Sequence, residues 1–166
     1  MRMTWLALGG AAIAATAALA QGMEEQPAPQ HDTAWHNAQM LYLAGLKPAD
    51  GWLNGPGGMR YRKVKSGQPG APHPAPTDVV TIHYAGRLID GSEFDSSIAR
   101  GEPATFPLPR LIKGWQLGVP LMAVGDTFEF ALPQSLAYGP EGKGPIPGGA
   151  TLLFTIELIA IPGAEG

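Results

Sequence analysis

The segment VTIHYAGRLIDGSEFDSS, residues 80–97, places acidic and hydroxyl groups close to aromatic side chains. Glu93 and Asp95 could act as an acid–base pair, and Ser96 or Ser97 could act as a nucleophile if a histidine activated it. Two carboxylates two positions apart are equally typical of a solvated strand edge. None of the four histidines stands in a motif that would activate a serine or bind a metal. The segment alone therefore gives little support to covalent catalysis.

Other catalytic and binding signatures are missing from the sequence. It contains no GxSxG, P-loop or HExxH motif. It has no cysteine, which excludes disulfides and thiolate catalysis. The net charge of −3 gives no footprint of nucleic-acid binding. We therefore expect no metal, no cofactor and no nucleic-acid partner.

Large apolar and aromatic side chains form a second pattern, because several lie near strand ends or in loops. These residues are Tyr84, Phe94, Phe106, Ile112, Trp115, Tyr138, Ile146 and Phe154. For any single one of them, a place in the core is the simplest interpretation. Tyr138 and Ile146 differ, because residues 137–149 are too rich in Gly and Pro for a core strand. Long loops that carry apolar side chains often form one wall of a binding site.

The pattern of the remaining chain predicts an α+β fold. Runs rich in strand-forming residues occupy residues 59–65, 78–89, 105–108, 126–132 and 150–161. In the last run, Leu152, Phe154, Ile156 and Leu158 alternate with their neighbours and should share one face. Residues 110–119 predict a helix of about two turns. We therefore expect an antiparallel sheet with one short helix packed against it.

The first 20 residues predict a cleavable export signal. Arg2 supplies a basic start, residues 5–19 carry no charge, and Ala18-Leu19-Ala20 fits the cleavage rule. An uncleaved membrane anchor is the alternative, but the apolar run is short and rich in Ala and Gly. Cleavage would remove one basic and no acidic residue, changing the net charge from −3 to −4. We therefore expect a periplasmic or secreted protein.

A short amphipathic helix should follow a flexible leader. Asp32 or Thr33 can cap it, Gly45 can end it and Pro48 prevents its continuation. Its apolar face is expected to contain Trp35, Ala38, Tyr42 and Leu46. This helix could pack on the domain or on a second subunit, and we expect a monomer because so short a helix is marginal by itself. The predicted organisation is a signal (1–20), a leader with helix and connector (21–58) and one domain (59–166).

Four segments, in this order, resemble the FKBP-type peptidyl-prolyl cis-trans isomerases, and together they cover nearly all of residues 78–159. They are VTIHYAGRLIDGSEFDSS, LIKGWQLGVPLMAVGD, LPQSLAYG and IPGGATLLFTIEL. Upstream, GMRYRKVKSG resembles the first strand of the exported bacterial members. The resemblance implies a twisted antiparallel sheet of about five strands wrapped around one short helix. It also implies an apolar pocket between the two.

The resemblance assigns roles to individual residues. The implied catalytic residues are Tyr84, Phe94, Asp95, Trp115, Tyr138 and Phe154. The implied substrate-binding residues are Arg100, Phe106, Leu111, Ile112 and Ile146. Trp115 would form the floor, the Ile112 N–H and the Tyr138 hydroxyl would meet substrate carbonyls, and Ile146 would close its loop over the ligand. An ion pair between Asp95 and Arg100 is expected.

Three features depart from the family pattern. Ala104 stands where a second aromatic is common, and an acidic rim residue is replaced by Arg110. The loop PEGKGPIP, residues 140–147, is about one residue short. The floor of the pocket is therefore expected to be kept. The rim, the sequence preference and the affinity for macrolide ligands are where we expect this chain to differ.

The implied function is rotation about X-Pro bonds in proline-containing unfolded or partly folded exported polypeptides, without covalent chemistry or a cofactor. One alternative is a chaperone or peptide-binding module with the same fold and weak isomerase activity. Another is an interaction domain that uses its N-terminal helix for dimerisation. Macrolides are further candidate ligands.

Overall fold

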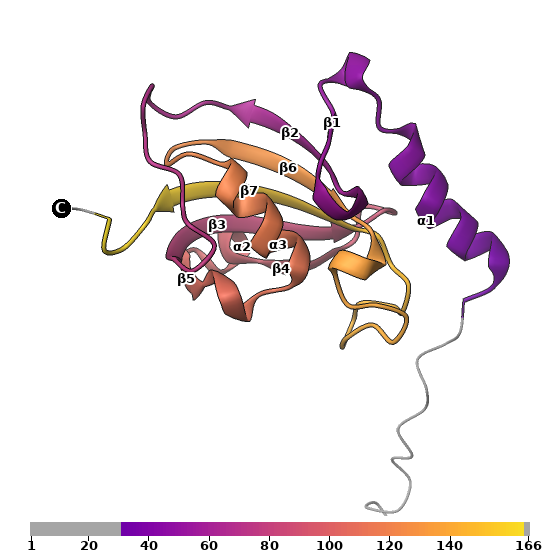
Figure 1. Ribbon diagram of the computed structural model, residues 1–166. Coiled ribbons are helices and arrows are strands. Elements are labelled where there is room, and N and C mark those ends of the chain that lie inside the picture. Colours follow the sequence, from indigo (N-terminus) through magenta and orange to yellow (C-terminus); the bar gives the residue numbers. More distant parts are fainter. Residues whose placement is uncertain (1–30, 165–166) are drawn as a thin grey trace, which may run out of the picture.

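The computed structural model describes residues 31–164 (Figure 1). The predicted export signal and the predicted flexible leader, residues 1–20 and 21–30, lie outside the described residues. One fully antiparallel sheet dominates the fold, with strand order β1-β2-β6-β7-β3-β4 and with β5 also paired to β3. The strands are β1 (Leu53–Asn54), β2 (Arg60–Lys65), β3 (Val79–Leu88), β4 (Glu93–Ser96), β5 (Ala104–Pro107), β6 (Thr127–Leu132) and β7 (Leu152–Ala160). The α+β prediction is confirmed.

The sheet has seven strands in the described residues, where about five were expected, because the short strand β1 is added at one edge and the other edge is divided. The first part of β3 pairs with β5 and its second part pairs with β4, so these two short strands lie end to end. The helical turn α2 (Ser97–Arg100) separates them. At Gly86 on β3, an added Cβ would lie 2.6 Å from the ring of Phe94 and 2.8 Å from that of Phe154. Glycine therefore lets both rings approach this strand.

The core lies between the sheet and α3 (Lys113–Gly118), which crosses one face of the sheet (Figure 1). The predicted alternation of β7 is confirmed, because its even-numbered residues 152–158 are all buried. The helix is shorter than predicted, since Leu108–Arg110 and Val119–Leu121 form separate 3-10 turns. An added Cβ would lie 2.4 Å from Leu132 at Gly114 and 2.7 Å from Phe130 at Gly118. These two glycines let α3 lie close against β6.

Helix α1 (Thr33–Gly45) has the predicted cap and end, because the backbone N–H of Trp35 donates to Asp32 Oδ1 at 2.8 Å. Its inward face differs from the predicted apolar face at one position. Ala38 is exposed, whereas Gln39 is buried and its Oε1 accepts the backbone N–H of Thr151 at 2.9 Å. The apolar pattern missed this polar residue, since backbone groups of a distant segment satisfy it.

In space, α1 lies beside the loop between β6 and β7, away from α3 (Figure 1). An added Cβ at Gly149 would lie 2.8 Å from the His36 ring. The helix therefore supports the loop from outside the sheet.

Within residues 31–164, no helix combines the length and apolar character needed to cross a bilayer.

Candidate active site

A cavity of about 380 Å³ opens between α3, the divided edge of the sheet and the loop between β6 and β7. Its lining residues are Tyr84, Phe94, Asp95, Phe106, Arg110, Leu111, Ile112, Trp115, Tyr138, Lys143 and Phe154. The structure thus brings together every residue expected at the site except Arg100 and Ile146. The long β3 strand, the two short strands beside it and β7 present one wall. The N-terminal end of α3 presents another.

The floor of the cavity is a set of aromatic rings fixed edge to face. The ring centroid of Trp115 lies 5.2 Å from that of Tyr84 and 5.1 Å from that of Phe154, with interplanar angles of 80° and 89°. Phe94 meets Phe154 in the same way at 5.7 Å. Edge-to-face pairs of this kind add about 0.5–1.5 kcal/mol each beyond their buried area. The floor is therefore a preformed apolar surface.

Polar groups occupy one side of this floor. The Tyr84 hydroxyl donates to Asp95 Oδ2, while Arg100 donates to Asp95 Oδ1 and, at 3.0 Å, to the Tyr84 hydroxyl oxygen. The expected ion pair between Asp95 and Arg100 is present. Arg100 does not line the cavity but holds two groups that do. The three side chains therefore orient one another.

These contacts shift the acidities of the groups involved. Burial raises the pKa of Tyr84, and its hydrogen bond to Asp95 raises it further. Burial opposes ionisation of Asp95, but the hydrogen bonds from Tyr84 and Arg100 and the charge of Arg100 outweigh it, so the pKa of Asp95 is lowered. Burial also raises the pKa of Tyr138, with the charge of Asp95 as a second cause. At neutral pH the cavity therefore holds a carboxylate and two neutral phenols.

The serines near this wall are structural. Ser97 is fully buried, and its Oγ accepts the backbone N–H of Tyr84 at 2.8 Å and lies 3.0 Å from His83 Nδ1. Ser96 caps α2 by accepting the N–H of Ala99. The Ser97–His83 contact was not anticipated from the sequence, because the two residues meet only across the β3–β4 pairing. Ser97 therefore joins α2 to β3, Ser96 caps α2, and neither serine lines the cavity.

The lip of the cavity is formed before α3. The Gln116 amide donates to the Leu111 carbonyl at 2.7 Å and to the Pro109 carbonyl at 3.3 Å, which fixes this turn. The Ile112 carbonyl accepts the backbone N–H of Trp115 at 3.0 Å. Among the described residues, no acceptor is found for the Ile112 N–H. The lip therefore presents a free backbone donor from a rigid turn.

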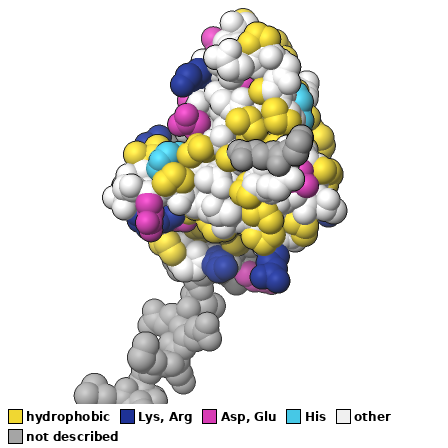
Figure 2. Space-filling view, turned by 90° about the vertical axis from the view of Figure 1, so that its left-hand side faces the viewer, with side chains coloured by type: hydrophobic (Ala, Val, Ile, Leu, Met, Phe, Trp, Pro, Cys, Tyr) yellow, Lys and Arg dark blue, Asp and Glu magenta, His cyan; other side chains and the backbone are white. Residues whose placement is uncertain are grey.

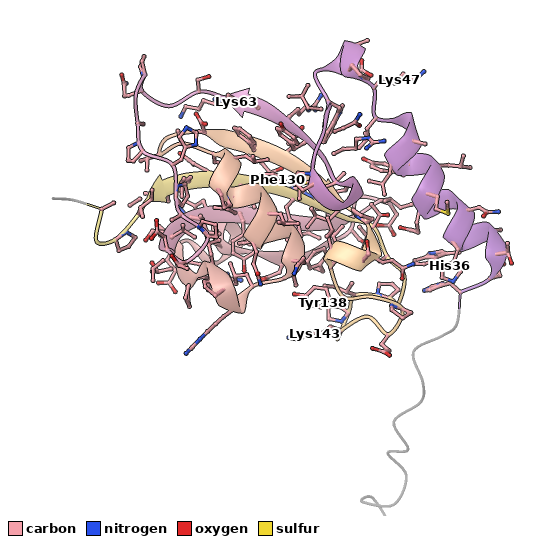
Figure 3. The ribbon with its side chains drawn as sticks, viewed as in Figure 1. His36, Lys47, Lys63, Phe130, Tyr138 and Lys143 are labelled. Atoms are coloured by element: carbon pink, nitrogen blue, oxygen red, sulfur yellow. The ribbon has the colours of Figure 1, made fainter. Side chains whose placement is uncertain are left out.

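The loop after β6 supplies the remaining wall. Tyr138 lies on it, and Lys143 Nζ lies 5.7 Å from the centroid of the Tyr138 ring (Figure 3). Lys143 was not singled out from the sequence, although a basic residue in the Gly/Pro-rich loop near Tyr138 was a usable signal. Ile146 is only 7% exposed and belongs to the core cluster. Its backbone pairs with that of Lys143 at 2.9 Å in both directions. This backbone pair holds Ile146 in the loop, and its side chain is not among the residues that line the cavity.

Comparison with known proteins identifies the class that this fold and cavity define. A family model described as FKBP-type peptidyl-prolyl cis-trans isomerase matches residues 70–159. The match covers more than half of the chain, so the chain belongs to this family. The resemblance found in the sequence is confirmed.

Two bacterial relatives illustrate the similarity. FKBP-type peptidyl-prolyl cis-trans isomerase FkpA of Aeromonas hydrophila is 50% identical over 127 residues, which are 75% of this chain and 47% of that protein. The FKBP-type 22 kDa peptidyl-prolyl cis-trans isomerase of Escherichia coli (strain K12) is 45% identical over 121 residues, which are 72% and 58% of the two chains. The chain thus spans about half the length of the curated relatives that it matches.

Solved structures agree with the fold. A peptidyl-prolyl cis-trans isomerase from Pseudomonas syringae pv. tomato superposes with a TM-score of 0.72 at 32% identity, over 79% of this chain and 96% of that one. The crystal structure of FkpA from Escherichia coli gives a TM-score of 0.72 at 35% identity, over 77% and 60% of the two chains. The α+β architecture is therefore shared with solved bacterial isomerases.

Proposed function

We propose that this chain is a peptidyl-prolyl cis-trans isomerase that accelerates X-Pro rotation in proline-containing unfolded or partly folded polypeptides. The observation that carries the proposal is the preformed aromatic floor around Trp115, with a free backbone donor at the Ile112 lip. A proline ring is flat enough and apolar enough for this floor. The amide to be rotated would then lie between the lip and the Asp95 wall.

The mechanism needs no nucleophile. Rotation about X-Pro has a barrier of about 18–20 kcal/mol, because the amide loses its resonance when it twists. The twisted amide is less dipolar than the planar one, so a dry aromatic cavity favours it over the ground state. Donors on the rim would hold the flanking carbonyls while the bond turns. Trp115 is the floor, and the Ile112 N–H and Tyr138 hydroxyl are the donors.

Asp95 is proposed to act through its partners and not as a general base. It is ionised, yet both its oxygens already accept from Tyr84 and Arg100. Its charge fixes the Tyr84 ring at the edge of the floor and polarises that side of the cavity. If Asp95→Asn kept full activity while Trp115→Ala and Phe94→Ala each abolished it, this electrostatic role would be wrong.

The experiment that tests the function is cis-to-trans isomerisation of a short Xaa-Pro peptide. Wild type should accelerate it strongly, Trp115→Ala should lose at least about a hundredfold in kcat/KM, and Tyr138→Phe should lose less. Trp52→Ala and Tyr42→Phe are matched controls, since neither residue lines the cavity. No acceleration by folded wild type would overturn the enzyme proposal.

A chaperone or peptide-binding module with weak isomerase activity is the second candidate. Ala104 favours it, because this half-buried position on β5 brings no second aromatic ring beside Phe106. Acceleration of a proline-limited refolding reaction supports the isomerase. Suppression of aggregation together with weak isomerase activity supports the module. Both assays use the same preparation.

The cellular setting is also a proposal. A relative from Legionella longbeachae, 41% identical over 121 residues, is named outer membrane protein MIP. Together with the sequence features of residues 1–20, this name supports export to the periplasm or beyond.

We propose a monomer whose isomerase domain spans residues 59–166, with macrolides as further ligands. Light scattering on the mature chain tests whether it is a monomer, and a macrolide titration of isomerase activity tests macrolide binding.

A further inference from the structure

Two basic side chains flank the mouth of the cavity from different walls. Arg110 lies in the 3-10 turn immediately before the Leu111–Ile112 lip, and Lys143 lies on the loop that carries Tyr138. Both residues are exposed and both line the cavity. Figure 3 shows Lys143 next to Tyr138 at the outer end of this loop. Both cations therefore belong to the lining that a peptide bound in this cavity would meet.

These cations have no acidic partner in the part of the chain that the structure describes. The ion pairs there join Arg62 to Glu129, Lys63 to Asp126, Arg87 to Glu93 and Arg100 to Asp95. Elsewhere the charges are mixed, and on the face seen in Figure 2 basic and acidic side chains are interspersed. The nearest acid in sequence to Lys143 is Glu141, which is exposed and does not line the cavity.

The one carboxylate of the cavity does not cancel this charge. Asp95 forms an ion pair with Arg100, and the two side chains together carry no net charge. The mouth therefore has a net positive charge, although the whole chain is at −3. A positive rim on a negative protein attracts acidic ligands locally, because a fixed cation acts over about one Debye length.

We propose that the cavity selects segments in which an Asp or Glu side chain directly flanks the proline. This inference rests on the proposed function, since it names the substrate class of the same cavity. With the proline ring on Trp115, the preceding and following side chains leave the cavity past the lip and the loop. Arg110 and Lys143 would meet a carboxylate there without moving the ring. Lys143 is already placed over Tyr138 by a cation–π contact.

The expected preference is moderate, because both cations are solvated. Exposed ion pairs change an equilibrium about twofold to fivefold. At low salt, wild type should therefore process a Glu-Pro peptide about twofold to fivefold better than its Gln-Pro counterpart, and a Lys-Pro peptide less well than either. The preference should shrink as salt rises from about 0.01 M to about 1 M, since the Debye length falls from about 30 Å to about 3 Å.

The test measures kcat/KM for matched peptides with Glu, Gln or Lys before the proline, and a second set with these residues after it. The Glu-to-Gln ratio should fall towards one in Arg110→Gln and Lys143→Gln, and should invert in the Arg110→Glu, Lys143→Glu double variant. Lys65→Glu is the matched control, because Lys65 is exposed on β2 and outside the cavity. It should keep the wild-type ratio.

The outcomes separate this inference from the proposed function. The same peptides are titrated by NMR, so that charge preference is measured in binding even where turnover is absent. Isomerisation with equal ratios for Glu, Gln and Lys overturns the inference only. A binding preference without isomerisation overturns the proposed function only. A preference that survives in the double variant, or that disappears in Lys65→Glu, also overturns the inference, since the rim would then not be its cause.

Discussion

Asp95 and Asp126 are two ionised aspartates in very different settings. Each pairs with a basic side chain, and the pKa of each is below its usual value. The side chain of Asp126 is 2% exposed, and its two oxygens accept the backbone N–H groups of Gly67 at 2.8 Å and Ala123 at 2.9 Å. The side chain of Asp95 is 45% exposed, and its main partners are the side chains of Tyr84 and Arg100, with the Ser96 backbone as a smaller contributor to its lowered pKa.

The difference shows that partners, more than acidity, identify what a carboxylate does. Asp126 joins two loops, and this junction is so close that an added Cβ at Gly67 would lie 2.2 Å from the Val124 carbonyl oxygen. Asp95 instead orients two side chains at the wall of a cavity. For Asp126 burial also opposes ionisation, and the donors outweigh it. The lowered pKa alone does not distinguish the two residues, because both carboxyl groups show it.

The largest expected effect is the loss of stability on Asp126→Asn. One carboxylate oxygen becomes an NH2 group facing a buried donor, which should cost about 2–4 kcal/mol in the free energy of unfolding. Urea unfolding measures it. Asp90→Asn is the matched control, because Asn can accept the same turn hydrogen bond from Ser92 and should leave stability close to wild type. A cost below about 0.5 kcal/mol for Asp126→Asn would contradict a structural role for Asp126 at the junction of the two loops.

A smaller effect is expected on activity from Asp95→Asn. The loss of charge weakens the hold on Tyr84 and Arg100, so kcat/KM should fall about tenfold, while the free energy of unfolding changes by less than about 1 kcal/mol. Glu93→Gln, on the same strand but outside the cavity, should keep wild-type activity. If Asp95→Asn instead destabilised the protein as much as Asp126→Asn does, the two aspartates would share one role.

The acid dependence of stability should separate them further. The folded pKa of Asp126 is lower than the value of 3.8 expected when unfolded, so its stabilisation is present above that pH and is lost as pH falls through the folded pKa. Wild type should therefore lose stability below about pH 4, and Asp126→Asn should show a shallower loss. Asp95→Asn should resemble wild type more closely, because its ion pair is exposed. Chemical unfolding between pH 3 and pH 6 measures these slopes.

The smallest expected effect is that of pH on catalysis near neutrality. The pKa of Asp95 is lowered from 3.8, and those of Tyr84 and Tyr138 are raised from 10.0. No histidine lines the cavity. We expect kcat/KM to vary less than about twofold from pH 6 to pH 9. A bell-shaped profile centred in this range would indicate general acid–base chemistry and would return Asp95 to a role as a base.

Sequence reasoning succeeded where structure is determined locally. The bounds of α1 follow from capping chemistry at Asp32 and from Gly45, and the alternation of β7 follows from its own residues. The cavity was found because the family segments carry its aromatic residues in a fixed order. Trp115 on α3 was recognisable in this way, although its neighbours come from distant strands.

Reasoning from the sequence failed where a partner is distant. Gln39 was not included in the predicted inward face of α1, because its acceptor role depends on Thr151, just before β7. The Ser97–His83 contact depends on strand register, and the division between β4 and β5 depends on how both pair with β3. The burial of Ile146 in the core depends on residues far along the chain, while its expected place over a ligand stays a prediction. None of these is visible in a local pattern.

The hydrogen bond between Gln39 and Thr151 joins residues 112 positions apart, which has a consequence for the order of folding. Until the segment with Gly149 and Thr151 is in place, α1 has nothing to dock on, and its Met40 and Leu41 are exposed as they are in the folded protein. Contacts of such high separation form late. The domain therefore closes from its last strand back to its first helix.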